Sequence, residues 1–585
     1  MRLWKSIVTV AVFIVSTIVL ISAGASVANA QIALPTDAKA TCTVSAAMFS
    51  GWFESGTVTL NGVVKPADSV NFPNIPNCSF HQWSEQMFLW LTSPAPANYG
   101  GGGGRIFASP TFYGVSPRDQ STGSRTFLPH RKGRKGPGRL LAPPLIGFRG
   151  SPTGPNGLPV VFDKSGPMLE VERPQLGPRG RPLLRDVSGK NVELGRATLG
   201  KNDKLTLDKA GKSIRAIFNP SDNLVRKFTI DKKPVFINGL GAVVNVGQGE
   251  ADGNVLMAQS AVVNVEQGEA DGNVLMAQNG SLVYYSIDVN DVFAYFATGA
   301  KNGGITPAPT QFPTTQADLD KVIAFATLHG KTFPDPKALA IEVKSSWIET
   351  AGLDLSKYIT TTATIPTYNM SSSIQWIPNG SKTVTLALVG MHVVGSTKGH
   401  PEMIWATFEH LSNSPNAAFS YTKTNNTTAT VPQSTAGSWQ FSASNAVAPF
   451  NSSHMNFTLP PKINAIATKT ISPSNTIRWK AFGMPFGAAS KSNTEVISIN
   501  NSVIGRLISG DIRRNYMMTG STWTIGGAAP TSANQAGTTL LANTTLETYD
   551  QGDNNKKNGT NCFGCHRTNT TDVSHIFNVL EPLFW

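Results

Sequence analysis

The residues Cys562-Phe563-Gly564-Cys565-His566 are the stretch of this chain whose types and spacing could do specific chemistry. Two cysteines separated by two residues and followed at once by a histidine form the C-x-x-C-H attachment pattern of c-type haem. One turn of chain holds the thiols where each can add to a haem vinyl group, and the imidazole can then bind iron. The pattern predicts one covalently bound haem (heme c) on Cys562 and Cys565, with His566 as an axial ligand.

Three other interpretations of this cysteine pair stay open. A thioredoxin-like redox pair needs a strand-to-helix start inside a βαβ unit, and only 19 residues follow His566. Half of a zinc site would need a second cysteine pair at structural-zinc spacing, and the sequence has none. A simple disulfide is the third interpretation.

His575 is the first candidate for the second axial iron ligand, because nine residues can span about 30 Å when extended and so pass round the ring edge. It could instead cap a turn with Asp572. The alternatives are an open iron position or one of several upstream residues: His392, His400, His410, Met391 and Met403. Of these, His392 is expected on the inner face of a strand, because alternation continues from Leu386 and Leu388.

An export signal is predicted at the N-terminus. A short basic start is followed by an apolar run from Ile7 to about Ile21 and by the cleavage pattern Ala28-Asn29-Ala30. This is typical of a secretory signal peptide over residues 1–30, and an uncleaved anchor is the alternative. The mature chain is expected in the periplasm or outside the cell, where c-type haem is assembled.

The two remaining cysteines, Cys42 and Cys78, are predicted to form a disulfide, because exported thiols tend to be oxidised. Two buried thiols are the alternative. Four cysteines in 585 residues exclude a disulfide scaffold.

The composition favours a β-rich α+β fold, with a large sandwich-like β scaffold, a few short helices and a C-terminal c-type haem segment. The chain is 40% hydrophobic and 15% charged, and its 54 glycines and 38 prolines indicate many turns. We expect an N-terminal β-rich region over 31–310, a second β-rich region over 311–540 and a haem-attachment segment over 541–585. Strands and turns rich in Ser, Thr and Asn suggest a sandwich between 412 and 501.

Several local elements can be predicted. A helix over 79–91 would put Trp83, Met87, Trp90 and Leu91 on one core-facing side. A second helix over 318–329 is capped at Thr315 and stopped by Gly330. The segment Thr544-Thr545-Leu546-Glu547 is a capping box that should open a short helix through Tyr549.

Residues 105–235 form a basic, Pro/Gly-rich region with 25 Lys and Arg against 10 Asp and Glu. An exported protein rarely meets nucleic acid, so the predicted partners are an acidic redox partner protein or an anionic membrane surface. A solvated loop without a partner is the alternative. A direct repeat follows over 243–278, in which each copy is expected to form a hairpin around Asp-Gly-Asn; a calcium site on its carboxylates is the alternative.

Four sequence blocks resemble a family of exported bacterial single-haem c-type cytochrome-like proteins with a C-terminal C-x-x-C-H motif. The blocks are residues 84–91, 278–285, 399–410, and 541–549 running into 562–566. The resemblance covers most of the mature chain and implies cytochrome c-like haem binding. In ordinary small cytochromes c the motif comes early, so here the preceding chain must build much of the haem pocket.

Three functions are compatible with these features. The first is electron transfer by a single haem. The second is a haem-dependent oxidoreductase with an open iron site, which the length of the chain favours. The third is a surface or binding protein with a structural or sensory haem.

Overall fold

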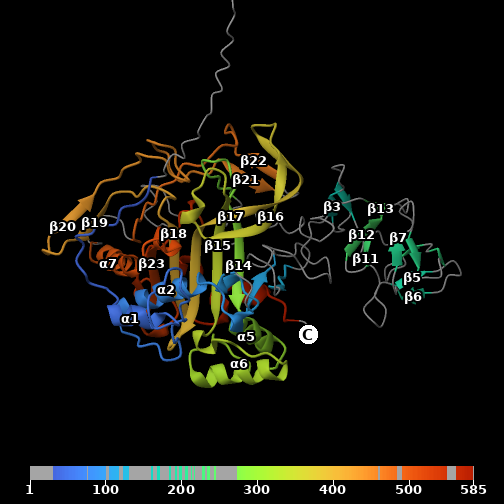
Figure 1. The fold of residues 1–585 in the computed structure, drawn as a ribbon, viewed down its shortest axis with the longest axis horizontal. Coiled ribbons are helices and arrows are strands. Elements are labelled where there is room, and N and C mark those ends of the chain that lie inside the picture. The colour runs from blue at the N-terminus through green and yellow to red at the C-terminus, as the bar shows by residue number, and fades with distance from the viewer. Residues whose placement is uncertain are drawn as a thin grey trace, which may run out of the picture.

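A curled antiparallel sheet of 11 strands is the centre of the structure, a computed structural model (Figure 1). The structure describes residues 30–75, 77–100, 104–116, 123–130, 273–458, 462–483, 490–549 and 562–583, together with the backbone of short strands between 160 and 244. The main path of the sheet runs β2-β1-β14-β15-β17-β18-β23-β24, and β16, β21 and β22 pair beside it. The predicted β-rich class with few helices is confirmed.

The strands of this sheet are β1 (Phe112–Val115), β2 (Phe127–Pro129), β14 (Tyr284–Asn290), β15 (Ile341–Glu349), β16 (Thr360–Asn369), β17 (Gln375–Thr397), β18 (His400–His410), β21 (Met455–Thr458), β22 (Lys462–Ala465), β23 (Tyr516–Thr524) and β24 (Gln535–Gly537). The helices are α1 (Ala46–Trp52), α2 (Cys78–Leu91), α5 (Asp291–Lys301), α6 (Gln316–Leu328), α7 (Ser490–Arg506), α8 (Cys562–Cys565) and α9 (His575–Val579).

The segment between 160 and 244 contributes short antiparallel strands in separate small sheets. They are β3 (Val160–Phe162), β4 (Met168–Glu170), β5 (Leu183–Arg185), β6 (Asn191–Glu193), β7 (Ala197–Leu199), β8 (Leu205–Leu207), β9 (Lys212–Ser213), β10 (Ala216–Ile217), β11 (Lys227–Ile230), β12 (Lys233–Ile237) and β13 (Val243–Val244). The rest of the basic region between 131 and 235, the predicted signal peptide and most of the repeat lie outside the described residues.

The sheet runs across position 310, where the sequence suggested a boundary between two regions. β14 pairs with β15 from Tyr284↔Trp347 to Val289↔Glu342, and β1 pairs with β14. Because β14 precedes position 310 and β15 follows it, their ladder joins both predicted regions in one sheet, and β15 then pairs with β17 over Ile341–Glu349.

Helices cover one face of the sheet. α2 contacts β17, β18 and β23, and α7 lies against β19 (Phe419–Thr422) and β23; Figure 1 shows both helices with α1 on the same side. The predicted apolar side of α2 is confirmed, because Trp83, Met87, Trp90 and Leu91 are all buried in the largest hydrophobic cluster.

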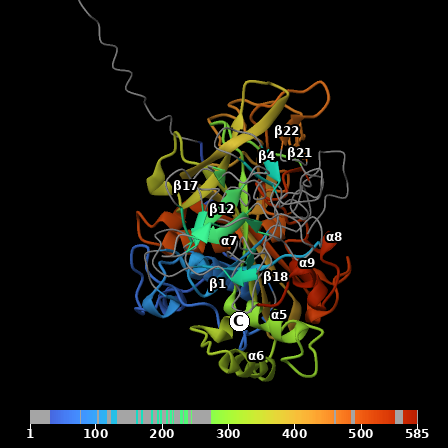
Figure 2. The same cartoon turned by 90° about the vertical axis from the view of Figure 1, so that its right-hand side faces the viewer.

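A second cluster lies at the α5–α6 end of the sheet and includes residues of the C-terminal segment. α6 begins as the sequence predicts: Thr315 Oγ1 accepts a hydrogen bond from the Asp318 backbone N–H, and Gly330 follows the helix with φ +68°. Figure 2 shows α8 and α9 beside α5, so the end of the chain returns to the sheet.

The sandwich expected between 412 and 501 differs from what forms there. The described residues of this stretch give the two-stranded pair of β19 and β20 (Thr428–Val431), the pair of β21 and β22, irregular segments and α7. Some of the polar Ser and Asn residues that suggested strands instead make side-chain hydrogen bonds to backbone two residues away, as Asn425 Oδ1 does with the Thr427 N–H and Ser453 Oγ with the Met455 carbonyl. Such local bonds compete with ladders.

Cys42 and Cys78 form the predicted disulfide, with their Cα atoms 5.2 Å apart. It joins the N-terminal segment to the first residue of α2.

In the described part of the chain, no helix has both the length and the apolar character needed to span a membrane.

Glu85 is a buried carboxyl group on α2 within this core. Its side chain is 4% exposed, and Oε1 has no hydrogen-bond partner among the described residues. Burial raises the pKa of Glu85 to about 8, so the folded protein holds this group as the neutral acid at pH 7.

The free energy of unfolding of Glu85→Gln should therefore increase relative to that of the wild type as pH rises. In the unfolded chain the carboxyl loses its proton near pH 4, whereas the folded chain keeps it to about pH 8. The folded state binds more protons in that window, so wild-type stability falls by up to about 1.4 kcal/mol per pH unit. Urea unfolding of both proteins between pH 4 and 9 measures this, and parallel curves would contradict it.

Candidate functional site

A β-bulge in β17 decides which side chains face the C-terminal segment. Ser346 of β15 pairs with Gly390, but the next residue, Trp347, pairs with Leu388, so Val389 has no partner of its own. Leu388 and Met391 are buried in the core on the α2 side, whereas Val389 is buried on the opposite face. A bulge of one residue exchanges the two faces for everything that follows.

The expectation that His392 shares a face with Leu386 and Leu388 is therefore wrong. Unbroken alternation would have put it there, but the bulge turns it to the other face, where its Nε2 lies 2.5 Å from Glu547 Oε1. His392 is thus brought to the side of the sheet on which the cysteine motif lies.

Residues 543–549 pack closely on this face, as turns rather than as the predicted helix. Asn543, one residue before the predicted cap, donates from Nδ2 to Thr407 Oγ1 (2.8 Å), and its own backbone N–H donates to Glu547 Oε2 (2.9 Å). A Cβ at Gly390 would lie 2.3 Å from Thr545 Oγ1, so only glycine permits this approach. Because the Glu547 carboxylate bonds both Asn543 and His392 of β17, it connects residues 543–549 to the sheet.

A buried ion pair completes this attachment. Glu409 Oε2 accepts from Arg478 Nη2 at 2.6 Å, and both side chains are fully buried. The other carboxylate oxygen, Oε1, accepts from the Thr544 backbone N–H at 2.6 Å. Removing one partner of such a pair typically costs about 3–5 kcal/mol, because the other charge is left buried.

The cysteine motif forms one short helical turn, α8. The His566 backbone N–H donates to the Cys562 carbonyl (2.9 Å), and Cys562 and Cys565 are not joined in a disulfide. His566 Nδ1 lies 2.5 Å from the carbonyl oxygen of Val573. A carbonyl can only accept, so Nδ1 carries the proton and the lone pair is on Nε2.

Burial and the nearby His575 lower the pKa of His566 to about 3, so the imidazole is neutral at neutral pH. A neutral imidazole with its proton fixed on one nitrogen is the form that binds a metal. In the described residues, Nε2 makes no hydrogen bond that would compete with a ligand bond. The donor set of two thiols one turn apart and one oriented imidazole therefore fits a c-type haem.

Aromatic rings lie on His566. The Trp405 ring centroid is 4.0 Å from that of His566, and the His575 ring stacks on it at 4.1 Å with an interplanar angle of 20°. Two ligands of one iron have the haem plane between them, which this direct stacking does not permit. His575 stays a prediction as the second ligand, and would have to leave the stack to serve as one.

An apolar bed surrounds the motif. Phe563 and Phe577 are each 6% exposed, and the other buried members from the C-terminal segment are Val573, Ile576 and Leu580. The end of the chain is held there by main-chain bonds: the Arg125 backbone N–H donates to the Val579 carbonyl (2.7 Å), and that of Glu581 donates to Arg125 (2.8 Å). Lys301 Nζ also donates to the Leu580 carbonyl at 2.6 Å.

Charged side chains lie beside the motif on the sheet. Burial raises the pKa of the Cys562 thiol, and the Glu547 carboxylate adds to this shift. Burial alone would raise the pKa of Glu547, but His392, the charge of Lys344 and the Asn543 backbone hydrogen bond together more than offset it, so the pKa is lowered. The His392–Glu547 pair and the cysteine turn are thus neighbours.

The other upstream candidates for the second ligand divide clearly. Both ring nitrogens of His400 lie near oxygens, of Glu402 (2.9 Å) and Asn74 (3.1 Å), and those of His410 lie near Ser412 and Lys357. Met391 is buried on the α2 side, whereas Met403 belongs to the same cluster as Phe563. His392 and Met403 are therefore the upstream candidates on the right face.

Four further histidines, to which no motif assigns a role, each have a polar neighbour. Their partners are Ser521 for His81, Asp288 for His130, the Phe325 carbonyl for His329 and the Ser472 carbonyl for His454. Among the described residues, no group of three or more His, Cys, Asp or Glu side chains could hold a metal ion.

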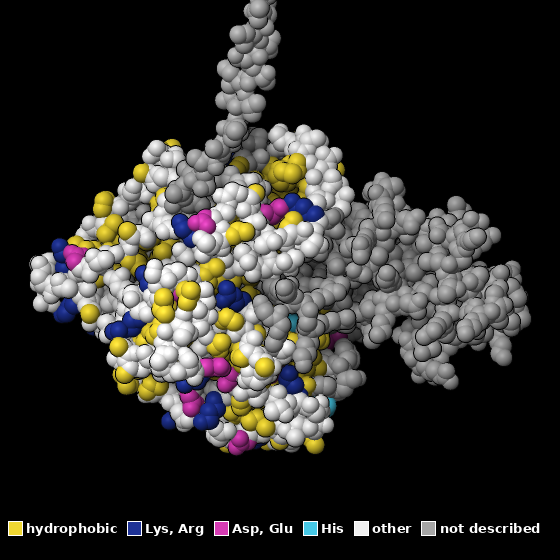
Figure 3. All heavy atoms as spheres, in the orientation of Figure 1, with side chains coloured by type: hydrophobic (Ala, Val, Ile, Leu, Met, Phe, Trp, Pro, Cys, Tyr) yellow, Lys and Arg dark blue, Asp and Glu magenta, His cyan; other side chains and the backbone are white. Residues whose placement is uncertain are grey.

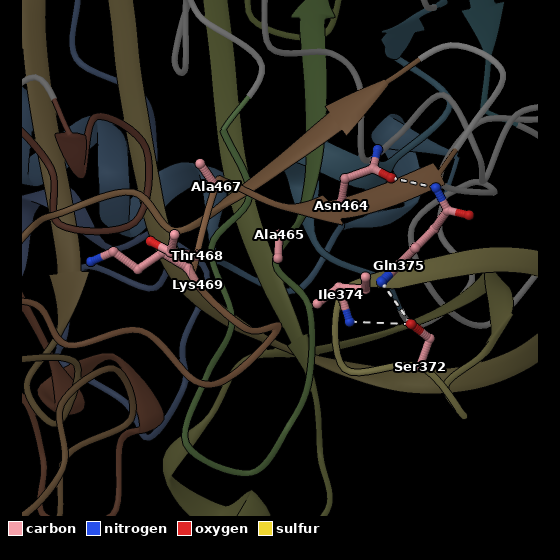
Figure 4. Close-up of a pocket in the computed structure, with 8 residues that line it drawn as sticks. All are labelled: Ser372, Ile374, Gln375, Asn464, Ala465, Ala467, Thr468 and Lys469. Carbon is pink, nitrogen blue, oxygen red and sulfur yellow. Dashed lines mark hydrogen bonds between the residues drawn. The ribbon is translucent and has the colours of Figure 1, made fainter.

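An open cleft of about 480 Å³ lies where β17 begins and pairs with β22 (Figure 4). Its lining is Ser372, Ile374, Gln375, Asn464, Ala465, Ala467, Thr468 and Lys469. Gln375 Nε2 donates to Asn464 Oδ1 across it (2.8 Å), and Lys469 is its one titratable residue. Nothing in this lining points to a reaction.

No family model, no curated protein and no solved structure matches this chain. The site is therefore described from its own residues. Sequence reasoning missed Trp405 and Glu547 as neighbours of the motif. Both stand in blocks that carried the resemblance, 399–410 and 541–549, but the pattern assigned neither a role.

Glu547→Ala should lower the free energy of unfolding by about 1–3 kcal/mol, because the Asn543 backbone N–H and His392 Nε2 both lose their acceptor. The matched control is Glu349→Ala, whose partner Lys382 is 47% exposed and whose loss should cost less than about 1 kcal/mol. Urea unfolding of both variants, with amide exchange at Asn543, measures the difference. Equal losses in the two variants would contradict it.

Proposed function

We propose that this chain is an exported c-type cytochrome that carries one covalently bound haem on Cys562 and Cys565, with His566 as an axial ligand, and transfers electrons. The hydrogen bond from His566 Nδ1 to the Val573 carbonyl is the observation that carries the proposal. It leaves Nε2 available on the residue that the motif assigns to iron. When bound, a haem would supply one-electron iron chemistry.

The surroundings of the motif support this function. An apolar bed of Phe563, Phe577 and Leu580 suits a large apolar ring, and its burial helps to set the reduction potential. The chain is anchored to the sheet before the attachment turn by Glu547, which lies 2.5 Å from His392, and after it by Ser574, whose Oγ donates to Glu342 Oε2 (2.7 Å). These contacts would hold His566 in one orientation.

Export is part of the proposal. The predicted signal peptide over 1–30 would direct the chain to the periplasm or beyond the cell, and the Cys42–Cys78 disulfide is compatible with an oxidising compartment. The redox partner is proposed to be an acidic protein that meets the basic region between 105 and 235, with an anionic membrane surface as the alternative. On the face seen in Figure 3, the described part carries acidic and basic side chains intermixed, so the steering charge is assigned to that region.

Haem attachment can be tested with matched pairs of cysteines. In a host that matures c-type cytochromes, the wild-type chain should keep haem on a denaturing gel and have the corresponding mass. Cys562→Ala/Cys565→Ala should lose the haem, because no thiol remains to bond it. The control Cys42→Ala/Cys78→Ala removes the disulfide instead and should keep the haem. A wild-type chain without haem by mass would refute the proposal.

A haem-dependent oxidoreductase with an open iron position is a second candidate function. The His392–Glu547 pair favours it, because a histidine and a carboxylate beside the attachment turn could exchange protons with a bound substrate. A simple electron carrier has no need of such a pair.

Carbon monoxide and cyanide distinguish the two functions. The electron-transfer proposal expects a six-coordinate, low-spin iron whose absorption spectrum is unchanged when either ligand is added. An oxidoreductase should be high-spin and bind both. If they bind, His392→Leu should change their affinity at least tenfold. The control His454→Leu, which removes a histidine that lies near the Ser472 carbonyl, should not change it.

A further inference from the structure

We propose that Trp405 and His575 are positioning residues that clamp the imidazole of His566 between them, and that the ligand on the opposite side of the iron comes from elsewhere. This inference rests on the proposed function. It gives a role to the block 399–410, whose sequence alone suggested none.

The clamp is visible in the ring geometry. The Trp405 and His575 centroids lie 4.0 Å and 4.1 Å from that of His566. Two rings this close to one imidazole, and making no ring contact with each other, lie on its two opposite faces. The Nδ1 bond to Val573 holds the edge of the same imidazole. The ring is therefore restrained on two faces and one edge.

Trp405 is held in place by an irregular part of β18. Its Nε1 donates to the Glu402 carbonyl at 2.9 Å, and Met403, the first of the two residues between them, is fully buried with φ +64°. A left-handed conformation is unusual for methionine and needs support from its surroundings. The ladder is also interrupted here, since Gly395 pairs with Ile404 but Thr397 pairs with His400.

The support comes from the buried Glu402 carboxylate. Its Oε1 accepts from the backbone N–H and Oγ1 of Thr524, both at 3.0 Å, and lies 2.9 Å from His400 Nδ1. These bonds tie the irregular turn to β23. Residues His400–Trp405 thus hold the indole ring of Trp405 in place, and we assign them no reactive role.

His575 is held from the other side. It is the first residue of α9, and the preceding Ser574 donates from Oγ to Glu342 Oε2 on β15 at 2.7 Å. The His575 ring is hydrogen-bonded to the backbone of Cys565, which belongs to the attachment turn itself. His575 is thus fixed to the same turn as His566, on the same side of any ring attached there.

A ligand held in this way cannot rotate away from the metal without first separating two packed rings. In this proposal the two rings also limit access of water to the Nδ1–carbonyl bond, which sets the basicity of Nε2. The second ligand, whether His392, Met403 or an added small molecule, must then approach from outside the stack.

The test uses the haem-loaded full-length chain and four variants. His575→Phe keeps a stacked ring but has no nitrogen to bind iron. Trp405→Phe keeps a ring on the other face, and Trp405→Leu removes it. The control Trp347→Leu removes another buried indole, on the α2 side of the sheet.

Two readouts are independent of activity. The spin state of His575→Phe, from its absorption spectrum, should equal that of the wild type. Solvent exchange of the His566 Nδ1 proton, followed by NMR, should be at least tenfold faster in Trp405→Leu than in the wild type, Trp405→Phe or Trp347→Leu.

Opposite results would overturn the clamp. A change to high spin in His575→Phe would make His575 the second ligand, and unchanged exchange in Trp405→Leu would leave Trp405 without a positioning role. A wild-type chain that carries no haem would refute the proposed function instead, and the clamp would then be judged on the exchange rates of the haem-free chain.

Discussion

The pairing of β17 with its neighbours is the constraint on which the rest of the structure depends. Its 23 residues, Gln375–Thr397, bond to β15, β16, β18 and β22. Because side chains alternate along a strand, the position of one bulge fixes which of them enter the α2 core and which face the C-terminal segment. Without this bulge, His392 would face the α2 core without its carboxylate, at a cost of several kcal/mol.

The site is assembled from parts that are distant in sequence. β15 supplies Glu342, β17 supplies His392 and β18 supplies Trp405, while the last 45 residues supply the cysteines and His566. Only the sheet brings these parts together. Polar contacts with high directional demands, such as Glu547 with His392, then fix the C-terminal segment in one register on its apolar bed.

Part of this arrangement could be predicted from the sequence, because it depends on local patterns. The apolar side of α2 and the Thr315 cap of α6 each depend on residues only three or four positions apart, so a short pattern predicts them. The Cys42–Cys78 bridge followed from counting cysteines in an exported chain. The motif itself named Cys562, Cys565 and His566.

The rest depends on interactions between distant residues, which a single sequence does not encode in any short pattern. The bulge at Val389 arises from three-dimensional pairing, and it reversed the expected face of His392. The predicted capping box at Thr544–Glu547 does not form, because the Glu547 carboxylate bonds Asn543 and His392 instead of the Thr544 backbone. The sequence placed Trp405 in a block of the resemblance, but it could not show that the indole lies against His566, which is 161 residues further on.

The order of the chain has a consequence for how such a protein would be made. Every strand of the large sheet precedes residue 541, and α8 and α9 follow it. During synthesis and export the sheet can therefore form before the attachment turn emerges, and the cysteines would arrive at a sheet that has already formed. An assembly enzyme acting on those thiols would have only the interval before this last segment docks, so docking speed would compete with haem attachment.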